Sequence, residues 1–407
     1  MLAPERRTRW DLAAAAALAL VVLVGFAALW WTSEARRTTL TPAPSPGVPA
    51  PVPLQQLPGA LVEAWRAASP ATPVPVVQGS TVVTAAGGEV AGRDLDTGAV
   101  RWSYRRDLPL CTVAAALHEV VAVYRRGGTC TEVTALNGND GRRAAQRTGP
   151  VPAPTRLAAA DDQVATTGRH YLEVWRYDLV RTLTYGRLPT PAQPGTQPRP
   201  DCLQGSVALG PGRLAVVEHC PGERVRLTVQ RSAPKQADQP EVIFSTLLRG
   251  TQARVVAITQ TRVAVAQPDP ARLVVLDEQG NAVAEHPLNV ADTDLRGDPP
   301  AGLVELTTTP TGLYWFTGSA TVALDTTELR PRWTHPGSLG PGSVVAGRLL
   351  VPVSGALAVL DPPSGAQVGA LPVDRNGYRG PVLTASAGDV TLEQRGDTLV
   401  ALRPRPR

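Results

Sequence analysis

The chain is poor in aromatic residues and in every cation except arginine. Aromatic residues make up 4% of its 407 positions, and of its 40 cationic residues only Lys235 is a lysine. The arginines are scattered along the chain, and 35 carboxylates offset most of their charge. A surface that binds nucleic acid needs its cations gathered on one face, so we expect no nucleic-acid partner.

The sequence also lacks a long amphipathic helical pattern after residue 40, which excludes a helical solenoid. Instead, 40 Pro and 37 Gly recur at intervals between short apolar runs rich in Val, Leu and Ala. This punctuation is typical of an all-β protein with many turns. The apolar fraction of 43% is sufficient for a large core.

One long apolar run lies near the N-terminus. Residues 12–31 carry no charge, and Trp10, Trp30 and Trp31 stand at the two ends of the run, where indole rings favour a membrane interface. Three arginines precede it within residues 6–9 and two follow at 36–37. We therefore predict a transmembrane helix over residues 10–31, a cytoplasmic tail over 1–9 and an extracytoplasmic remainder. The alternative is a signal peptide cleaved after Ser33-Glu34-Ala35, which has small residues at the recognised positions.

Residues 32–60 are expected to be a linker. Between residues 39 and 60 the chain has seven prolines and no charged side chain. Such a composition favours a semi-extended spacer that would lift a domain over residues 61–407 away from the membrane.

The four cysteines are Cys111, Cys130, Cys202 and Cys220, and no two have metal-site spacing. An even number of cysteines outside the cytoplasm suggests disulfides, with three connectivities open. We favour Cys111–Cys130 and Cys202–Cys220, because each pair falls at a matching place within one repeat. The alternative is four free buried thiols.

The part after the linker is repetitive. Residues 90–102 read VAGRDLDTGAVRW, and related segments occur at 133–145, 273–285, 321–333 and 357–369. Each has an apolar strand, then Asp or Asn, a turn, and a second strand that often carries Trp. The residues that define this unit are Asp94, Thr97, Gly98, Trp102, Asp325, Trp333, Asp361 and Gly365. We interpret the Trp as an apolar cover for the inner strands of the next repeat.

Copies recur about every 45 residues, and a further hairpin precedes each, as in the four-stranded blades of a propeller. After residue 381 only three strands remain, whereas residues 61–67, with Trp65, resemble a lone fourth strand. We predict that this N-terminal strand completes the last blade. Fourth strands at 62–67, 100–104, 142–147, 181–186, 241–245, 282–287, 330–334 and 367–372 give eight blades, with seven as the alternative.

The segment from Asp94 to Trp102 resembles the D-x-x-T-G-x-x-x-W signature of quinoprotein-type (PQQ-like) propeller repeats. The resemblance covers about residues 61–404 and is degenerate in the other copies. It implies an eight-bladed propeller, in a family that includes quinone-cofactor dehydrogenases, a scaffold lipoprotein of outer-membrane protein assembly and ligand-sensing ectodomains.

The sequence shows no catalytic, cofactor-binding or metal site. The vicinal cysteine pair of the dehydrogenases is missing, and no carboxylate cluster suits their calcium ion. Asp94-x-Asp96-x-Gly98 and residues 137–141 resemble calcium loops, but both lie in repeat turns, where Asp, Asn and Gly are expected anyway.

We therefore expect a non-catalytic scaffold or binding module of the cell envelope. Its partner would be an envelope protein or a cell-wall polymer, bound through the long loops at 188–200, 231–240 and 289–300. The alternatives are a quinoprotein-type oxidoreductase and a ligand-sensing ectodomain.

Overall fold

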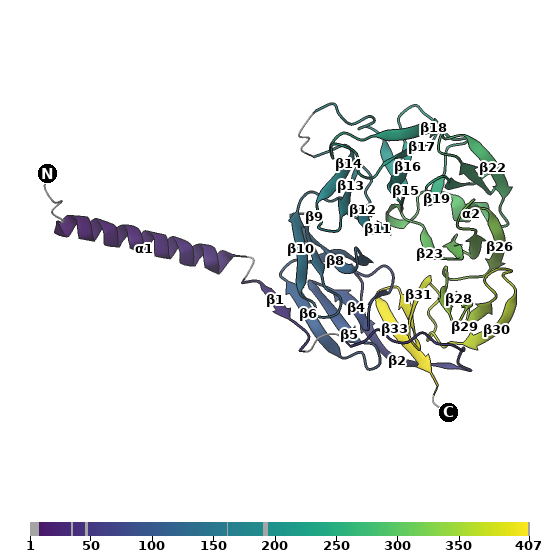
Figure 1. Cartoon of the computed structure of the whole chain (residues 1–407), viewed down its shortest axis with the longest axis horizontal. Coiled ribbons are helices and arrows are strands. Elements are labelled where there is room, and N and C mark those ends of the chain that lie inside the picture. The colour runs from purple at the N-terminus through teal and green to yellow at the C-terminus, as the bar shows by residue number, and fades with distance from the viewer. Residues whose placement is uncertain (1–7, 34–35, 45–47, 161, 190–193, 406–407) are drawn as a thin grey trace.

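The computed structural model describes residues 8–33, 36–44, 48–160, 162–189 and 194–405. One long helix, α1 (Arg9–Thr32), stands apart from a ring of β-sheets (Figure 1). It is long and apolar enough to cross a membrane, judged by length and composition. Most of the expected cytoplasmic tail, residues 1–7, lies outside the described residues.

The ring contains eight sheets, and we number these blades along the chain. Blade 1 contains β3 (Val76–Gln78), β4 (Thr81–Ala86), β5 (Glu89–Asp94) and β6 (Val100–Arg106). Blade 2 contains β7 (Leu110–Ala116), β8 (Glu119–Arg126), β9 (Thr129–Leu136) and β10 (Arg143–Thr148). Blade 3 contains β11 (Leu157–Ala160), β12 (Gln163–Thr166), β13 (Tyr171–Arg176) and β14 (Arg181–Gly186). Blade 4 contains β15 (Leu203–Gly210), β16 (Arg213–His219), β17 (Arg226–Arg231) and β18 (Val242–Leu247).

Blade 5 contains β19 (Arg254–Ile258), β20 (Val263–Gln267), β21 (Arg272–Leu276) and β22 (Ala282–Pro287). Blade 6 contains β23 (Glu305–Thr309), β24 (Gly312–Phe316), β25 (Ala320–Leu324) and β26 (Pro331–Pro336). Blade 7 contains β27 (Ser343–Val345), β28 (Arg348–Val353), β29 (Ala356–Leu360) and β30 (Gln367–Pro372). Blade 8 contains β31 (Val382–Ala387), β32 (Val390–Arg395), β33 (Thr398–Pro404) and β2 (Leu61–Ala68).

Two features of the prediction are confirmed. The structure has eight blades, so the seven-bladed alternative is wrong. The N-terminal strand β2 pairs antiparallel with the C-terminal strand β33, from Leu61 opposite Pro404 to Ala68 opposite Thr398. This pairing closes the ring and leaves no blade incomplete.

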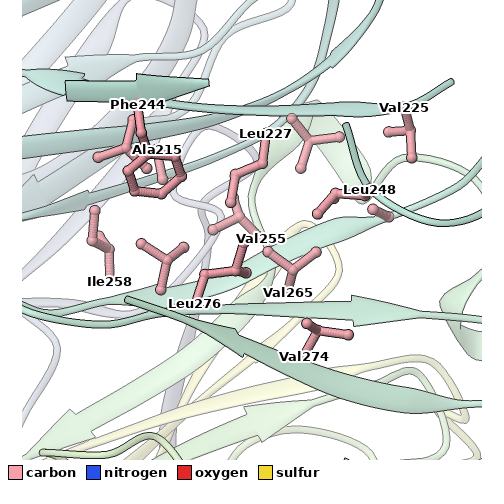
Figure 2. Close-up of a cluster of buried hydrophobic side chains, with 14 residues drawn as sticks. Ala215, Val225, Leu227, Phe244, Leu248, Val255, Ile258, Val265, Val274 and Leu276 are labelled. Atoms are coloured by element: carbon pink, nitrogen blue, oxygen red, sulfur yellow. The ribbon is translucent and has the colours of Figure 1, made fainter. Parts of the chain in front are cut away.

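The blades pack through apolar side chains on both faces of each sheet. Along β16, Leu214 and Val216 join a buried cluster with blade 3, whereas Ala215 and Val217 join one with blade 5. Figure 2 shows the second cluster, in which Phe244 and Ala215 of blade 4 lie across from Val255, Ile258 and Leu276 of blade 5. Because alternate residues meet different neighbouring blades, the inner strands read as continuous apolar runs. Each fully buried Val or Leu contributes about 1.5–3 kcal/mol.

The turn between the third and fourth strands explains the repeat motif. In blade 1 the Asp94 carboxylate accepts hydrogen bonds from the backbone N–H groups of Asp96 and Thr97 and from the Thr97 hydroxyl, at 2.8–3.1 Å. Gly98 follows with φ +70°, a conformation that favours glycine. Asp325 in blade 6 and Asp361 in blade 7 bind their turns in the same way.

The motif tryptophans cover the turn of the next blade, not its inner strands as the sequence suggested. Trp102 of blade 1 donates its indole N–H to the Gly138 carbonyl of blade 2 at 2.9 Å, and a Cβ at Gly141 would lie 2.6 Å from its ring. Trp333 of blade 6 binds the turn of blade 7 in the same way, through Pro362 and Gly365. Glycine is therefore required where the next ring approaches the backbone.

The linker differs from the expected free spacer. Strand β1 (Thr38–Thr41) pairs antiparallel with β6 and adds a fifth strand to the outer edge of blade 1. Residues 48–60, which we call the strap, then pack beneath blades 1, 7 and 8. The Ser80 hydroxyl donates to the Val48 carbonyl at 3.0 Å, and Leu54 and Leu57 pack against a buried cluster of blades 7 and 8. Much of residues 32–60 therefore belongs to the folded unit.

Candidate binding surfaces

The ring has two faces. The inner strands begin on the face that carries the connections between blades, which we call the loop face. The inner strands end in tight turns on the opposite face of the ring. We call this opposite face the turn face. The connections at 188–200 and 289–300 belong to the loop face, and the strap crosses the turn face.

A disulfide fixes the first connection to blade 4. Cys202, just before β15, is bonded to Cys220, just after β16, as expected from the sequence. The other disulfide, Cys111–Cys130, joins β7 to β9 within blade 2. The structure thus contains both favoured pairs, and none of its described cysteines is free.

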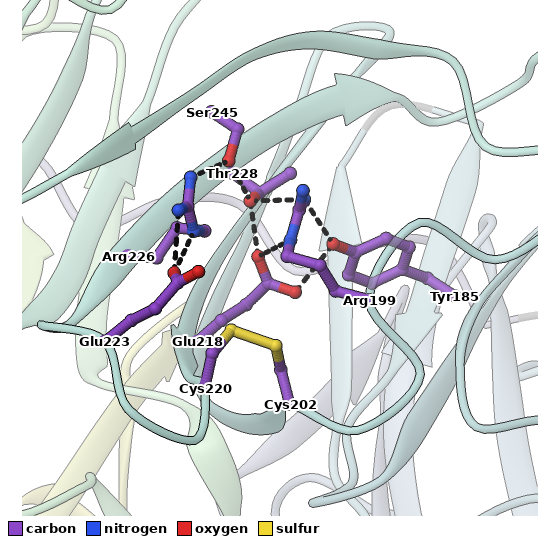
Figure 3. The surroundings of a disulfide bond; sticks show 9 residues. All are labelled: Tyr185, Arg199, Cys202, Glu218, Cys220, Glu223, Arg226, Thr228 and Ser245. Carbon is purple, nitrogen blue, oxygen red and sulfur yellow. Dashed lines mark hydrogen bonds and ion pairs between the residues drawn. A yellow bond between two sulfur atoms is a disulfide. The ribbon is translucent and has the colours of Figure 1, made fainter.

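A buried ion pair lies beside Cys202–Cys220 (Figure 3). The Arg199 guanidinium donates to Glu218 Oε2 at 3.0 Å and to the Tyr185 hydroxyl at 2.9 Å, and Tyr185 donates to Glu218 Oε1 at 2.6 Å. The Glu218 side chain is only 1% exposed, and Thr228 also donates to it. Burial raises the pKa of Tyr185 well above its ordinary value, and the adjacent Glu218 carboxylate adds to this shift.

The connection at 289–300 meets the same region. It contains the short helix α2 (Asp292–Leu295) and ends in the 3₁₀ turn η1 (Pro300–Gly302). His219, next to Cys220, lies 3.0 Å from Asp298 through its Nε2 atom, and Arg169 lies 3.7 Å from the same carboxylate. Side chains from blades 3 and 4 therefore hold a loop that belongs to blades 5 and 6.

The third loop, at 231–240, packs against blade 3. The Thr184 backbone N–H on β14 donates to the Ala237 carbonyl at 2.7 Å, and Thr182 donates to Ser232. The loop thus covers an outer edge strand that would otherwise expose its hydrogen-bonding groups. The described parts of the three long loops are therefore held against the ring, but residues 231–240 join β17 to β18 and leave blade 4 on the turn face, unlike the other two loops.

The centre of the ring contains a pocket of about 360 Å³ beside the strap and a larger one of about 860 Å³. The inner strands β11, β15, β19 and β23 line the larger pocket with Ala, Val, Leu and Ile, and threonines line it near the turn face.

Arg156 of blade 3 and Glu305 of blade 6 form a bidentate ion pair near the loop face, with N–O distances of 2.6 and 3.3 Å. This pair therefore bridges two blades that are not adjacent in the ring.

The sequence did not identify these charged pairs. Arg199 and Glu218 are 19 residues apart and meet because the connection before β15 lies against β16. Arg156 and Glu305 are 149 residues apart, and only the closed ring brings them together. Asp94 is the last residue of β5, and Thr97, Gly98, Asp325, Asp361 and Gly365 lie between the third and fourth strands of their blades. Among the residues that the structure describes, no group of three or more His, Cys, Asp or Glu could hold a metal ion.

A PQQ-type family model described as "Outer membrane protein assembly factor BamB" matches residues 56–178. The chain carries PQQ-like β-propeller repeats. BamB from Moraxella catarrhalis is similar in structure, with a TM-score of 0.51 and 12% identity over 84% of this chain and 100% of that one. No curated protein matches these PQQ-like repeats by sequence.

Two further solved structures resemble this PQQ-like propeller. The quinohemoprotein alcohol dehydrogenase ADHIIG from Pseudomonas putida HK5 has a TM-score of 0.50 and 11% identity over 87% of this chain and 80% of that one. Sqt1 from Saccharomyces cerevisiae has a TM-score of 0.52 and 9% identity over 87% and 100%. Identities this low show the shared fold alone.

Proposed function

We propose that this protein is a membrane-tethered propeller of the cell envelope, which binds another envelope protein through its loop face and catalyses no reaction. The fixed surface around Cys202–Cys220 carries the proposal. There the disulfide, the Arg199–Glu218 pair and the His219–Asp298 contact hold loops from several blades. A surface that is already ordered loses little conformational entropy when it binds a partner.

Three further observations support this placement and role. The helix α1 has 24 residues, which suits a membrane anchor, and three arginines before the apolar run against two after it favour an N-terminus inside. The two disulfides suit an oxidising compartment outside the cytoplasm. The family model that matches residues 56–178 is described as an outer membrane protein assembly factor, and a factor that assembles proteins has to contact them.

Photo-crosslinking in the native membrane tests the proposal. Benzoylphenylalanine is placed at Arg224, an exposed loop-face position near Cys220, and at Gln279, an exposed turn-face position, as a matched control. We expect the probe at 224 to capture one envelope protein reproducibly and the probe at 279 not to capture it. Replacing residues 289–300 by a Gly-Ser segment should abolish that adduct. Equal capture from both faces, or no protein adduct at all, would contradict the proposal.

The larger central pocket favours a second candidate, a ligand-sensing ectodomain. Its volume of about 860 Å³ and apolar lining suit a drug-sized molecule. Measurements on the purified chain distinguish a quinoprotein-type oxidoreductase from the protein-binding and ligand-sensing roles. An oxidoreductase of this type would show a quinone absorbance band and one bound calcium ion, whereas the two binding roles require neither.

A further inference from the structure

The connection between α1 and the ring is short. The helix ends at Thr32 and β1 begins at Thr38, and six residues of fully extended chain span at most about 20 Å. Arg37 already lies 3.9 Å from Asp107, in the connection between blades 1 and 2. If Trp30 and Trp31 lie at the interface, as tryptophans at helix ends favour, this edge of blade 1 cannot lie far from the lipid headgroups.

Strand direction shows which part of the edge this is. Thr38, the first residue of β1, pairs with Arg106 at the end of β6, and Thr41 pairs with Ser103. The chain therefore reaches the ring at the loop face and runs along blade 1 towards the turn face. The part nearest the helix is the loop-face corner of blades 1 and 2.

This corner is rich in arginine. Arg105 and Arg37 are 66% and 58% exposed, and the Arg125 backbone N–H donates to Pro109, which places Arg125 beside the same connection. We define the corner by the exposed residues Arg36, Arg37, Arg105, Arg125 and Arg126, whereas Arg106 beside them is buried and paired with Glu132. The carboxylates that face these arginines are Glu89, Asp107 and Glu132, and Glu34 adds a fourth from the connecting sequence. Arginine is in excess even when all four are counted.

The chemistry of the corner suits phosphate. Arg36 places its guanidinium 4.0 Å above the ring of Trp31, so a cation lies directly at the end of the apolar helix. Guanidinium groups bind phosphate oxygens through paired N–H donors, and anionic leaflets attract basic segments next to a membrane helix. A tether also keeps the corner at a high local concentration near the surface.

We propose that the loop-face corner of blades 1 and 2 binds anionic phospholipid headgroups, so that the ring stands on the membrane by this edge. The proposal rests on the tethering proposed above. In this orientation the edge of the ring faces the bilayer. The loop face around Cys202–Cys220 lies across the ring from blade 1 and stays accessible to a partner.

The test uses the full chain in nanodiscs of phosphatidylcholine alone or with 30% phosphatidylglycerol, with benzoylphenylalanine at Thr129. This exposed residue donates to the Arg126 carbonyl at 3.2 Å. We expect lipid adducts that increase severalfold with phosphatidylglycerol. A matched probe at Arg224 in blade 4 should form few adducts in either lipid.

Charge variants make the test specific. In the triple variant R37Q/R105Q/R125Q, adducts at 129 in the anionic nanodiscs should fall by up to about fivefold for each arginine removed. The control R249Q/R330Q/R332Q removes the same charge from exposed positions on blades 4–6 and should leave the yield unchanged. Adducts independent of phosphatidylglycerol, or an equal loss in both variants, would overturn the inference.

A third probe separates the two proposals. Leu29 in α1 is 71% exposed in the structure, and a probe there should react with acyl chains if the helix spans the bilayer. Lipid adducts at 29 without adducts at 129 would overturn only the orientation. The absence of adducts at both positions would overturn the tether and the orientation together.

Discussion

Trp65, on the strand that completes the last blade, packs its indole ring on Gly98 of the first blade. Its indole N–H donates to the Leu95 carbonyl at 2.9 Å, and a Cβ added to Gly98 would lie 2.7 Å from the ring. The same contact joins Trp102 to Gly141 and Trp333 to Gly365. The contact between Trp65 and Gly98 lies between blade 8, which β2 completes, and blade 1. We call this junction between the last and the first blade the seam.

Gly98→Ala should destabilise the seam. The left-handed φ of +70° costs a Cβ-bearing residue about 1–2 kcal/mol, and displacing the Trp65 ring adds about 1–3 kcal/mol. The control is Gly127→Ala, where φ is +57° but no atom lies within 4 Å of the added Cβ. Urea denaturation should show a larger loss of unfolding free energy for Gly98→Ala. Equal losses would mean that the ring contact adds nothing beyond backbone strain.

The strap should contribute to stability although its sequence resembles a linker. Leu57→Ala removes a half-buried side chain from the cluster that includes Leu61, Leu350 and Val400, and we expect a loss of about 1–2 kcal/mol. Val52→Ala in the same segment is the control, because Val52 is 81% exposed. The melting temperatures of the two variants provide the measurement. If they are the same, the strap does not pack on the ring in solution.

Most of the propeller was predictable from sequence because its signals are local. The spacing from Asp94 to Trp102 encodes a turn and an inter-blade contact within nine residues, and similar spacings mark other blades. Closure by β2 followed from counting strands at the two ends. The favoured cysteine pairs were predictable because each lies at a matching place within one repeat.

The parts that could not be predicted depend on contacts between distant segments. Strand β1 is TTLT followed by a proline-rich stretch, and its pairing depends on the free edge of β6 more than 60 residues later. The Arg156–Glu305 pair depends on the curvature of the ring, which no local pattern encodes. The Trp motif was recognised, but its target in the next blade required the orientation of neighbouring sheets.

The disulfide Cys202–Cys220 should hold the loop that carries Arg199. Removing it by C202A/C220A should cost about 3 kcal/mol in the chain-entropy model, and C111A/C130A should cost a similar amount because the sequence separations are 18 and 19. The two variants should differ in local order. Limited trypsinolysis under native conditions should cut after Arg187, an exposed residue that precedes Leu188 in the same connection, rapidly in the first variant and slowly in the second. Similar cleavage would show that the Arg199–Glu218 pair holds the loop without the disulfide.

The turn aspartates should make stability depend on pH. Burial alone would raise the pKa of Asp94, but the hydrogen bonds from Thr97 and Asp96 outweigh it and lower that pKa, and the turn N–H groups do the same at Asp325. An unfolded aspartate titrates near pH 4, so the folded chain binds fewer protons there than the unfolded chain. The stabilisation is therefore complete above that pH and is lost as the pH falls through the lower folded pKa.

The variant D94N/D325N tests this dependence, because asparagine keeps a carbonyl acceptor and loses the charge. We expect the wild type to be more stable at pH 7 and the two curves of unfolding free energy to converge as the pH falls from about 5 to below 3. Asp162→Asn, at an exposed position, is the control, and its curve of unfolding free energy against pH should be parallel to that of the wild type. A constant gap between D94N/D325N and the wild type over this range would show that the turns depend on hydrogen-bond geometry and not on ionised carboxylates.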